Sequence, residues 1–537
     1  MNKFEEYKKI KHPLTVIDDI YRYAETGFDS IEEEHFNLFK WYGVYQQRPK
    51  DGYFMMRIKV PGGRITAPQA REVAAIATKY GRGLIDITTR QTFQYHWLKI
   101  EDMPDIFARL ESVGLTSAGA CGDIARNITS CPVAGLAHDE LFDVRPTVNK
   151  LQDFFHNNKD FANLPRKYKI AVVACPVHCA LPQINDFSLI GAKNEAGANG
   201  FHYYVGGGLS TQPHISQNVG IWLPEEQVID GARVVSEIYR DALELREKRT
   251  HARLKFLVAD KGIEWFRDEF IKRLGWTPEP ATNIHLPDDT FRDHVGVTAQ
   301  KQEGLNWIGL CVLTGRIDDE KLIRAADIAD EYGSGDLCLT NVQNMIVPNV
   351  PTEKLEGAKT ALAAAGYEWD VPNIRRGAMA CTGIEFCNLA LTETKLRMKD
   401  IIAYLETKVE TDRGIKINMN GCPNSCAQHH VGDIGLQGCV AKLADGSKVE
   451  AYDIHLGGQL GADARFTRAI HRKVPADNVK YAIENVIKSY YSTRTPDERF
   501  AVWAHRHTNE ELDAFLGVPT IVGAPDLPAS AKEAVPA

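Results

Sequence analysis

The 537-residue sequence lacks an apolar run long enough to span a bilayer, and its first residues, MNKFEEYKKIKHPL, contain no apolar core of signal-peptide length. These absences predict a cytoplasmic protein without a membrane partner, whose eleven cysteines are reduced. An excess of positive charge is also missing, since the formal net charge is −8. This charge argues against a general nucleic-acid-binding protein, although a local basic pocket is compatible with it.

The sequence also lacks a recognisable flavin or nicotinamide site. The segment VGGGLS at 205–210 does not have the Gly-x-Gly-x-x-Gly pattern in the strand–turn–helix setting of a dinucleotide site. Cysteine pairs separated by two residues, which are typical of structural zinc, do not occur either. A redox enzyme with this sequence would therefore take its electrons from another protein.

Two cysteine pairs of a different kind lie in the C-terminal half. Cys381 and Cys387 are separated by five residues in CTGIEFC, and Cys422 and Cys426 by three in NGCPNSC. Thiolates are the preferred ligands of iron–sulfur clusters, and the proline after Cys422 is similar to the Cys-Pro step of ferredoxin-type cluster loops. The two pairs predict a [4Fe–4S] cluster with these four cysteines as its ligands.

A strand–helix–strand–helix pattern occurs twice along the chain. In its first copy, Thr66 is a candidate cap of a helix that runs to Tyr80, and residues 84–100 are predicted as one long strand. The segment Gly63-Arg64-Ile65 recurs as Gly315-Arg316-Ile317, an offset of 252 residues (315 − 63). Helix caps and turn glycines that match in one register indicate an internal duplication.

The duplication extends to the cysteines. The matching pairs are Cys131 with Cys381, Cys175 with Cys422, and Cys179 with Cys426. Ala137 stands where the first half would need a counterpart of Cys387, and Cys121 lies ten residues before Cys131 rather than six after it. We therefore expect one cluster, in the second half, and interpret the first-half thiols as relics packed in the core. An iron content near eight per chain would instead favour a second cluster.

Several motifs resemble those of one enzyme family. CTGIEFCNLALTETK followed by NGCPNSCAQHHVGDIGLQG resembles the cluster pattern C-x5-C…C-x3-C of the sirohaem sulfite and nitrite reductases. Other segments match in the family's order, namely FMMRIKVPGG, TTRQTFQYH, GDIARN, LPRKYK, VGGGLS and HARLKFLV. The resemblance extends from about residue 15 to 510. It implies an α+β (α/β) fold with a pseudo-two-fold internal repeat and ferredoxin-like half repeats.

The repeat and the resemblance together give an expected domain order. It comprises an N-terminal arm (1–50), a first ferredoxin-like half repeat (51–118), a first sirohaem- and substrate-binding module (119–285), a second half repeat (286–367), a [4Fe–4S]- and sirohaem-binding module (368–515) and a disordered tail (516–537).

The resemblance implies the six-electron reduction of sulfite to sulfide in assimilatory sulfur metabolism, with ferredoxin or a separate flavoprotein as donor. The sirohaem iron would share a cysteine sulfur with the cluster, and by position this is Cys426. An assimilatory nitrite reductase, which forms ammonia, is the alternative within the family. An iron–sulfur electron-transfer or structural metal protein is the non-enzymatic alternative, and it leaves the cationic motifs unexplained.

Four cations match the family's substrate-binding residues. They are Arg57 in MMRIK, Arg126 in DIARN, and Lys167 and Lys169 in LPRKYK. An ordinary alternating strand would also place the two lysines on one face, and both could then reach one anion. Nitrite-preferring plant-type relatives usually have Asn where Lys169 stands. Because a doubly charged anion gains more from the extra cation than nitrite does, Lys169 favours sulfite.

Sirohaem carries eight carboxylates, so its pocket needs cations and backbone donors. The residues that resemble the family's haem contacts are Arg90, Gln94, His96, Gly207, Arg253, Lys255 and Asn420, together with Cys426. In addition, Tyr45 and Cys121 lie in contexts where some ferredoxin-type sulfite reductases carry a Tyr–Cys thioether. The alternative for this pair is a stacking tyrosine and a buried free thiol.

Overall fold

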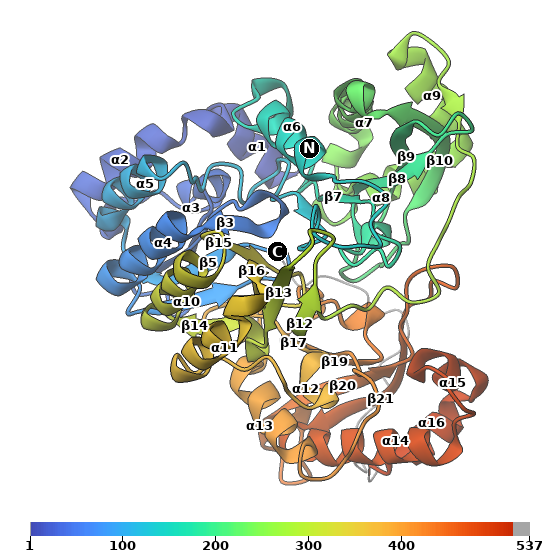
Figure 1. The fold of residues 1–537 in the computed structure, drawn as a ribbon. Coiled ribbons are helices and arrows are strands. Elements are labelled where there is room, and N and C mark those ends of the chain that lie inside the picture. Colours follow the sequence, from blue (N-terminus) through green and yellow to red (C-terminus); the bar gives the residue numbers. More distant parts are fainter. Residues whose placement is uncertain (1, 519–537) are drawn as a thin grey trace. The chain divides into compact units, whose positions relative to one another are not determined.

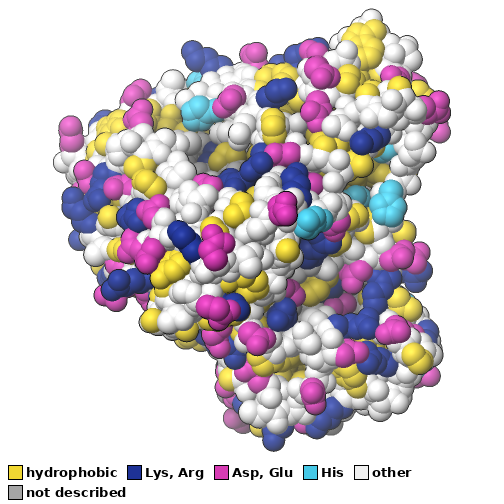
Figure 2. Space-filling view, viewed as in Figure 1, with side chains coloured by type: hydrophobic (Ala, Val, Ile, Leu, Met, Phe, Trp, Pro, Cys, Tyr) yellow, Lys and Arg dark blue, Asp and Glu magenta, His cyan; other side chains and the backbone are white. Residues whose placement is uncertain are grey.

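The computed structural model describes residues 2–518, so most of the predicted tail lies outside the described residues. The chain forms two compact units (Figure 1). The first contains residues 1–371 and 460–463, and the second contains 372–459 and the described residues from 464 onward. No described helix is long and apolar enough to cross a membrane. Acidic and basic side chains are intermingled on the face seen in Figure 2.

The first unit contains two five-stranded sheets that exchange a strand. One sheet has the order β1 (Val44–Gln46), β2 (Phe54–Arg57), β5 (Phe93–Leu98), β4 (Leu84–Ile87) and β14 (Arg316–Asp318). The other has the order β12 (Gly296–Ala299), β13 (Leu305–Leu310), β16 (Met345–Pro351), β15 (Asp336–Leu339) and β3 (Arg64–Thr66). Because β3 and β14 each complete the sheet of the other half repeat, the two half repeats cannot fold as independent bodies.

The helices of the half repeats begin where the sequence predicts. Thr66 caps α4 (Ala67–Tyr80) in a reciprocal capping box with Gln69, and Asp318 caps α10 (Asp319–Tyr332). Figure 1 shows α4 and α10 side by side against the sheets. The shorter helices α5 (Met103–Ser112) and α11 (Leu355–Ala364) follow in the two copies. Their buried faces contribute to one core that both half repeats share.

The prediction of one long strand over residues 84–100 is wrong. The segment forms a hairpin, in which β4 and β5 are joined by a tight turn from Thr88 to Thr92. The Thr88 N–H donates to the Thr92 carbonyl at 2.8 Å, and Gln91 has a positive φ of 54°. The polar residues TTRQT thus interrupt the strand, although their threonines are typical of strands.

Two glutamines repeat the same contact across the pseudo-two-fold. Gln91 donates through Nε2 to the Leu339 carbonyl at 3.0 Å, and Gln343 donates to the Ile87 carbonyl at 3.1 Å. Both the donors and the acceptors are separated by the 252 residues of the sequence repeat (343 − 91 and 339 − 87). The duplication predicted from the sequence is therefore present in the contacts of the fold.

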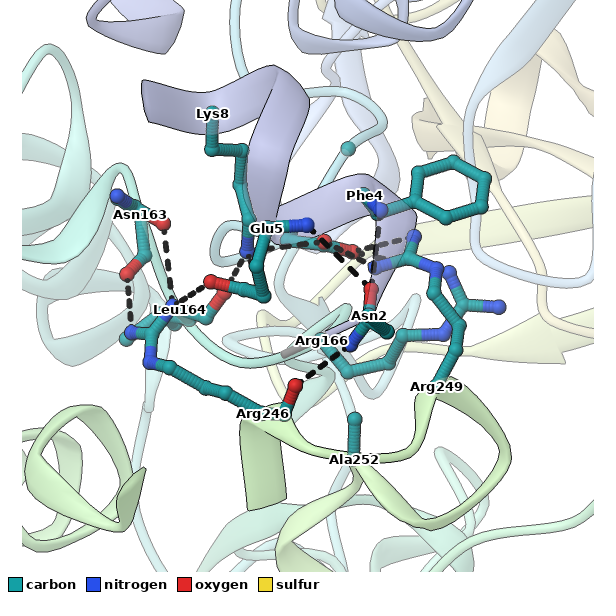
Figure 3. A network of polar contacts seen from close by, with 12 residues as sticks. Asn2, Phe4, Glu5, Lys8, Asn163, Leu164, Arg166, Arg246, Arg249 and Ala252 are labelled. Atoms are coloured by element: carbon teal, nitrogen blue, oxygen red, sulfur yellow. Dashed lines mark hydrogen bonds and ion pairs between the residues drawn. The ribbon is translucent and has the colours of Figure 1, made fainter. Parts of the chain in front are cut away.

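The N-terminal segment packs against this unit through α1 (Lys3–Ile10), α2 (Ile17–Thr26) and α3 (His35–Leu38). Lys8 of α1 is buried and forms ion pairs with Glu5 and with Asp123, the latter at 3.4 Å. Figure 3 shows α1 surrounded by residues that are distant in sequence, including Arg246 and Arg249. These polar contacts fix the segment to the core.

Each remaining module is built on a mixed sheet, one in each unit. The sheet of the first unit has the order β11 (Glu279–Pro280), β10 (Gln217–Pro224), β9 (Asn199–Val205), β8 (Phe187–Lys193), β7 (Ile170–Val173) and β6 (Thr129–Ser130). The second unit repeats it as β17 (Ala378–Ala380), β18 (Ile417–Asn420), β19 (Ile434–Lys442), β20 (Lys448–Leu456) and β21 (Arg468–Pro475). Counted from β6 in the first sheet and from β17 in the second, the first two strand pairs are parallel and the next two are antiparallel.

Helices cover these sheets and complete the two units (Figure 1). Those of the first unit are α6 (Arg145–Phe155), α7 (Val228–Asp241), α8 (Leu254–Lys261) and α9 (Ile263–Leu274). Those of the second unit are α12 (Asn373–Arg376), α13 (Lys395–Leu405), α14 (Val479–Thr493), α15 (Phe500–Arg506) and α16 (Asn509–Leu516).

Candidate functional site

Two adjacent loops of the second unit carry the four predicted cluster cysteines. Cys381 directly follows β17, and Cys422 comes two residues after β18. These strands are parallel neighbours, so their carboxyl ends meet at one edge of the sheet. The Cys381 N–H donates to the Met419 carbonyl at 3.1 Å, which joins the two loops. Cys387 and Cys426 follow within the same loops.

The four thiols lie within electrostatic reach of one another. Burial, and then the neighbouring Cys426, raise the pKa of Cys381 and of Cys422 to about 12, and Cys387 acts in the same direction on both. Backbone and side-chain donors point at two of the sulfurs. Gly421 N–H donates to Cys381 Sγ at 3.3 Å, and Asn424 Nδ2 donates to Cys422 Sγ at 3.6 Å.

This arrangement fits an iron–sulfur cluster. The cations of a cluster remove the repulsion between neighbouring thiolates, and hydrogen bonds to the sulfurs are a known means of setting its potential. Cys426 is the exposed member of the set, whereas Cys422 is buried. An exposed sulfur retains room for a second bond partner, in agreement with the bridging role that the resemblance implies for Cys426.

Three of the predicted substrate cations share one face of the first unit. Ala125 and Tyr168 form a parallel bridge, and the Arg126 N–H donates to the Tyr168 carbonyl at 2.8 Å. Side chains alternate along extended backbone, so Arg126, Lys167 and Lys169 lie opposite the buried Ala125 and Tyr168. All three cationic side chains are half-buried. The face therefore presents three positive charges in a partly desolvated setting.

Arg57, the fourth predicted cation, lies at the end of β2. Its guanidinium donates to Gln94 Oε1 at 2.8 Å and to Cys121 Sγ at 3.6 Å. Burial and a contact with Cys121 raise the pKa of Tyr45, whereas Arg126 and Arg57 act to lower it. The structure thus brings together Tyr45, Cys121 and both predicted arginines. The thioether between Tyr45 and Cys121 stays a prediction.

Arg90 is half-buried among like charges. Burial, and then repulsion from Arg126, lower its pKa to about 9, with further repulsion from Arg57 and Arg253. Its guanidinium donates to Asn185 Oδ1 at 2.8 Å and to the Ile170 carbonyl at 3.1 Å. Its Nε has no hydrogen-bond partner among the described residues.

Lys59 belongs to the same positive region, although it is not among the residues predicted from the sequence. It is 3% exposed, and burial followed by repulsion from Arg126 lowers its pKa to about 8. Lys59 lies two residues after Arg57, on the same side of extended backbone. This two-residue spacing is the feature of the sequence that could have identified Lys59 as a site residue. A buried region in which cations repel one another favours binding of an anion.

Arg253 and Lys255 lie beside the VGGGLS loop. Arg253 forms a bidentate ion pair with the buried Asp186, at 2.6 and 2.8 Å. Burial, and then Arg253, lower the pKa of Lys255 to about 7, and its ammonium donates to the Leu209 carbonyl at 3.1 Å. A side chain at Gly207 would collide with backbone carbonyls of the protein itself, so internal packing alone requires this glycine. Among these residues Lys255, whose ammonium donates to the Leu209 and Gln212 carbonyls, is the plainest candidate for binding an anionic ligand.

Gln94 and His96 form a buried polar chain. Gln94 Nε2 lies 3.3 Å from His96 Nε2, which lies 3.1 Å from Asp86 Oδ2. Asp86 in turn pairs with Arg316. In the second unit, Asn420 accepts from the Ala427 N–H at 2.7 Å, while its Nδ2 has no partner among the described residues. The side chains of Arg90 and Asn420 thus retain donors for a bound group.

The first-half cysteines are buried, as expected. Cys131 directly follows β6, and Cys175 comes two residues after β7, as Cys381 and Cys422 follow β17 and β18. Cys131, Cys175 and Cys179 lie within 4.8 Å of one another, which makes them the tightest set of candidate metal ligands in the described part of the chain. The spacing of these cysteines in the sequence does not indicate this proximity.

Comparisons with known proteins agree with this architecture. The family described as "Nitrite and sulphite reductase 4Fe-4S domain" matches residues 121–278 and 373–518. The family described as "Nitrite/Sulfite reductase ferredoxin-like half domain" matches residues 45–113 and 298–365. Both families match twice, as the duplication requires.

Individual relatives cover nearly the whole chain. Sulfite reductase (ferredoxin) 2 of Mycolicibacterium paratuberculosis is 37% identical over 95% of this chain and 96% of its own length. The assimilatory ferredoxin-dependent nitrite reductase of Haloferax mediterranei is 37% identical over 94% of this chain and 91% of its own. The solved structure of the Mycobacterium tuberculosis NirA protein superposes with a TM-score of 0.91, at 36% identity over 95% of this chain and 97% of that chain.

These matches confirm the duplicated α+β fold with ferredoxin-like half repeats and the [4Fe–4S] domain. The chain belongs to the nitrite and sulfite reductase family, whose members use sirohaem and a [4Fe–4S] cluster.

Proposed function

We propose that this protein reduces sulfite to sulfide with six electrons delivered by ferredoxin. The observation that carries the proposal is the shared face of Arg126, Lys167 and Lys169, together with Arg90 and Lys59, which Arg126 repels. Such a region stabilises a small, doubly charged anion because its cations are partly desolvated and already in place. The names of a related sulfite reductase and of a related nitrite reductase both include ferredoxin.

The four substrate cations have two tasks in this proposal. Arg57 is held by Gln94 and Arg126 is held by its own loop, so both guanidinium groups are oriented before an anion arrives. Arginine offers a planar fork for oxyanions, whereas lysine can release a proton and be reprotonated. Lys167 and Lys169 would thus supply protons as the three oxygens of sulfite leave as water, and both arginines would hold the anion.

Two sets of residues are proposed to hold the cofactors. Cys381, Cys387, Cys422 and Cys426 would bind the cluster, with Cys426 also bound to the sirohaem iron. The residues proposed to contact sirohaem are Arg90, Gln94, His96, Gly207, Arg253, Lys255 and Asn420. When bound, this pair of groups stores and relays single electrons to the substrate.

Nitrite reduction is the second candidate function. The assimilatory nitrite reductase of Haloferax mediterranei is as similar to this chain as the mycobacterial sulfite reductase is, so overall identity does not separate the two activities. Lys169 favours sulfite, because nitrite carries one charge and gains less from the additional cation than sulfite does.

Steady-state kinetics of the purified protein, expressed together with sirohaem synthesis, test the proposal. Reduced ferredoxin should support a higher kcat/KM for sulfite than for nitrite, and visible spectra should show an isobacteriochlorin together with the cluster. A higher kcat/KM for nitrite would favour the second candidate. A protein with cluster iron and no haem spectrum would contradict both.

A further inference from the structure

Three buried thiols converge in the first unit, away from the cluster cysteines in sequence. Cys131 follows β6, and Cys175 and Cys179 follow the parallel neighbour β7. Their sulfurs lie within 4.8 Å of one another, and the Cys175 and Cys179 sulfurs are 3.5 Å apart. None of the three residues is more than 4% exposed. The proposed function makes no use of this group.

The spacing of the sulfurs fits one metal ion better than a cluster. A tetrahedral zinc ion with Zn–S bonds of about 2.3 Å places two thiolates about 3.8 Å apart. A four-iron cluster spreads its thiolates farther, because each binds a different iron. The cysteines of the second unit form no group this tight among the described residues. The group of three also lacks a counterpart of Cys387, since the buried Ala137 stands at that position.

A buried imidazole near these sulfurs offers a fourth ligand. His294 is 5% exposed, and neither of its ring nitrogens has a hydrogen-bond partner within the described residues. His294 interacts electrostatically with Cys175, and the Arg292 carbonyl lies beside its ring outside hydrogen-bond geometry. Zinc-bound histidine often has such a carbonyl at its second nitrogen. The His294 nitrogens are outside the 4.8 Å group, so ligation requires the side chain to turn toward the sulfurs.

We propose that Cys131, Cys175 and Cys179 bind one Zn²⁺ ion, with His294 as its fourth ligand. Each thiol that binds the ion releases its proton to solvent, and the ion remains divalent, so no oxidant or reductant is required. The ion would join the loops after β6 and β7 to the segment before β12. Its role would be structural, because a site with four protein ligands leaves no position for a substrate.

Metal analysis of the purified holoenzyme tests the proposal. The wild type should contain one zinc per chain besides the iron of its cluster and haem. The double variant Cys175→Ala/Cys179→Ala should lose at least about nine-tenths of this zinc and keep its iron. Cys338→Ala, which removes another buried thiol of the same unit, should retain the zinc. His294→Gln should release zinc to a chelator about 10-fold faster than the wild type.

Three results would overturn the proposal. The first is a wild type without zinc, and the second is a zinc content that the double substitution leaves unchanged. The third is additional iron and sulfide that the double substitution removes, which would indicate a second cluster. Should the double variant fail to fold, crystals of the wild-type holoenzyme decide the question. Anomalous scattering above the zinc edge should show a peak among the three sulfurs. No peak there, or a disulfide between Cys175 and Cys179, would contradict a zinc site.

Discussion

Lys169 lies at the end of the segment that carries the substrate cations, and its backbone N–H donates to Asp186 Oδ2 at 2.8 Å. Replacing it with Asn removes one positive charge from a partly desolvated face and leaves the backbone contact intact. We expect kcat/KM for sulfite to fall by at least about 10-fold more than kcat/KM for nitrite, which corresponds to about 1.4 kcal/mol of transition-state stabilisation. Steady-state assays with both anions and one donor measure this difference.

Two further variants define the Lys169 effect. Lys169→Arg keeps the charge and should recover most of the preference for sulfite. Lys193→Asn changes an exposed lysine at the end of β8 and should alter neither value. Equal losses for sulfite and nitrite in Lys169→Asn would remove the basis for assigning sulfite.

Side chains in short motifs could be predicted from the sequence, whereas their burial could not. Arg57, Arg126, Lys167 and Lys169 were found because each lies in a recognisable string of residues. The burial and the repulsion that lower the pKa of Arg90 were not predictable, since they arise from distant parts of the chain, with Arg126 and Arg253 among the repelling charges. Lys59 was not predicted, because its two-residue spacing from Arg57 indicates a shared side of the backbone and does not show that the lysine is buried.

Among the secondary-structure elements, the exchanged strands β3 and β14 directly follow Gly63 and Gly315, where the backbone packs closely. Both have positive φ, at 76° and 70°, and an added Cβ would collide with the Leu339 carbonyl at Gly63 and the Ile87 carbonyl at Gly315. We expect Gly63→Ala to destabilise the first unit by more than about 2 kcal/mol, because backbone strain adds to the collision. Thermal unfolding of the holoenzyme, followed by circular dichroism, measures the loss.

Gly114→Ala separates the effect of backbone strain from the effect of the collision. Gly114 has a similar φ of 72°, but a Cβ there would meet nothing within 4 Å. This variant should show only the conformational cost, about 1 kcal/mol. If Gly63→Ala and Gly114→Ala lowered stability equally, the close approach at the exchanged strands would contribute nothing.

Element identity could be predicted more readily than pairing. Thr66 and Asp318 identify their helices because capping is a local interaction. The turn at Thr88–Thr92 was missed because its residues are also common in strands. The exchange of β3 and β14 was missed because hydrophobic alternation shows which residues face a core, and not which strand lies alongside.

At the scale of the whole molecule, duplication has preserved the scaffold while the sites have diverged. Both modules keep two parallel strand pairs followed by two antiparallel pairs. In each, an aspartate accepts the backbone N–H of a lysine at 2.8 Å, Asp186 from Lys169 and Asp433 from Lys416. The arrangement of the thiols differs between the modules. Four are spread over the loops after β17 and β18, whereas three lie close together in the loops after β6 and β7. The sequence offsets revealed the shared scaffold, and only the structure revealed the proximity of the three thiols.

Asp123 joins the N-terminal helix to the rest of the first unit. Burial alone would raise the pKa of its carboxyl, but Arg249, Lys8 and Arg166 outweigh burial and hold the pKa well below its usual value. Asp123→Asn leaves these three cations without their shared counter-charge. We expect a loss of about 3–5 kcal/mol at pH 7, as for other buried ion pairs that lose one partner. Asp29→Asn, at an exposed position, should change stability by less than about 0.5 kcal/mol.

The sign of the pH dependence follows from the lowered pKa of Asp123. An unfolded aspartate titrates near pH 4, so the stabilisation by Asp123 is complete above about pH 4 and is lost as pH falls through the lower folded-state pKa. The stability difference between the wild type and Asp123→Asn should therefore stay constant from pH 7 to about pH 5 and shrink below pH 4. Unfolding curves across this range, with hydrogen exchange of residues 3–10, measure it. A difference that grew on acidification would show that Asp123 does not carry the charge that fixes α1.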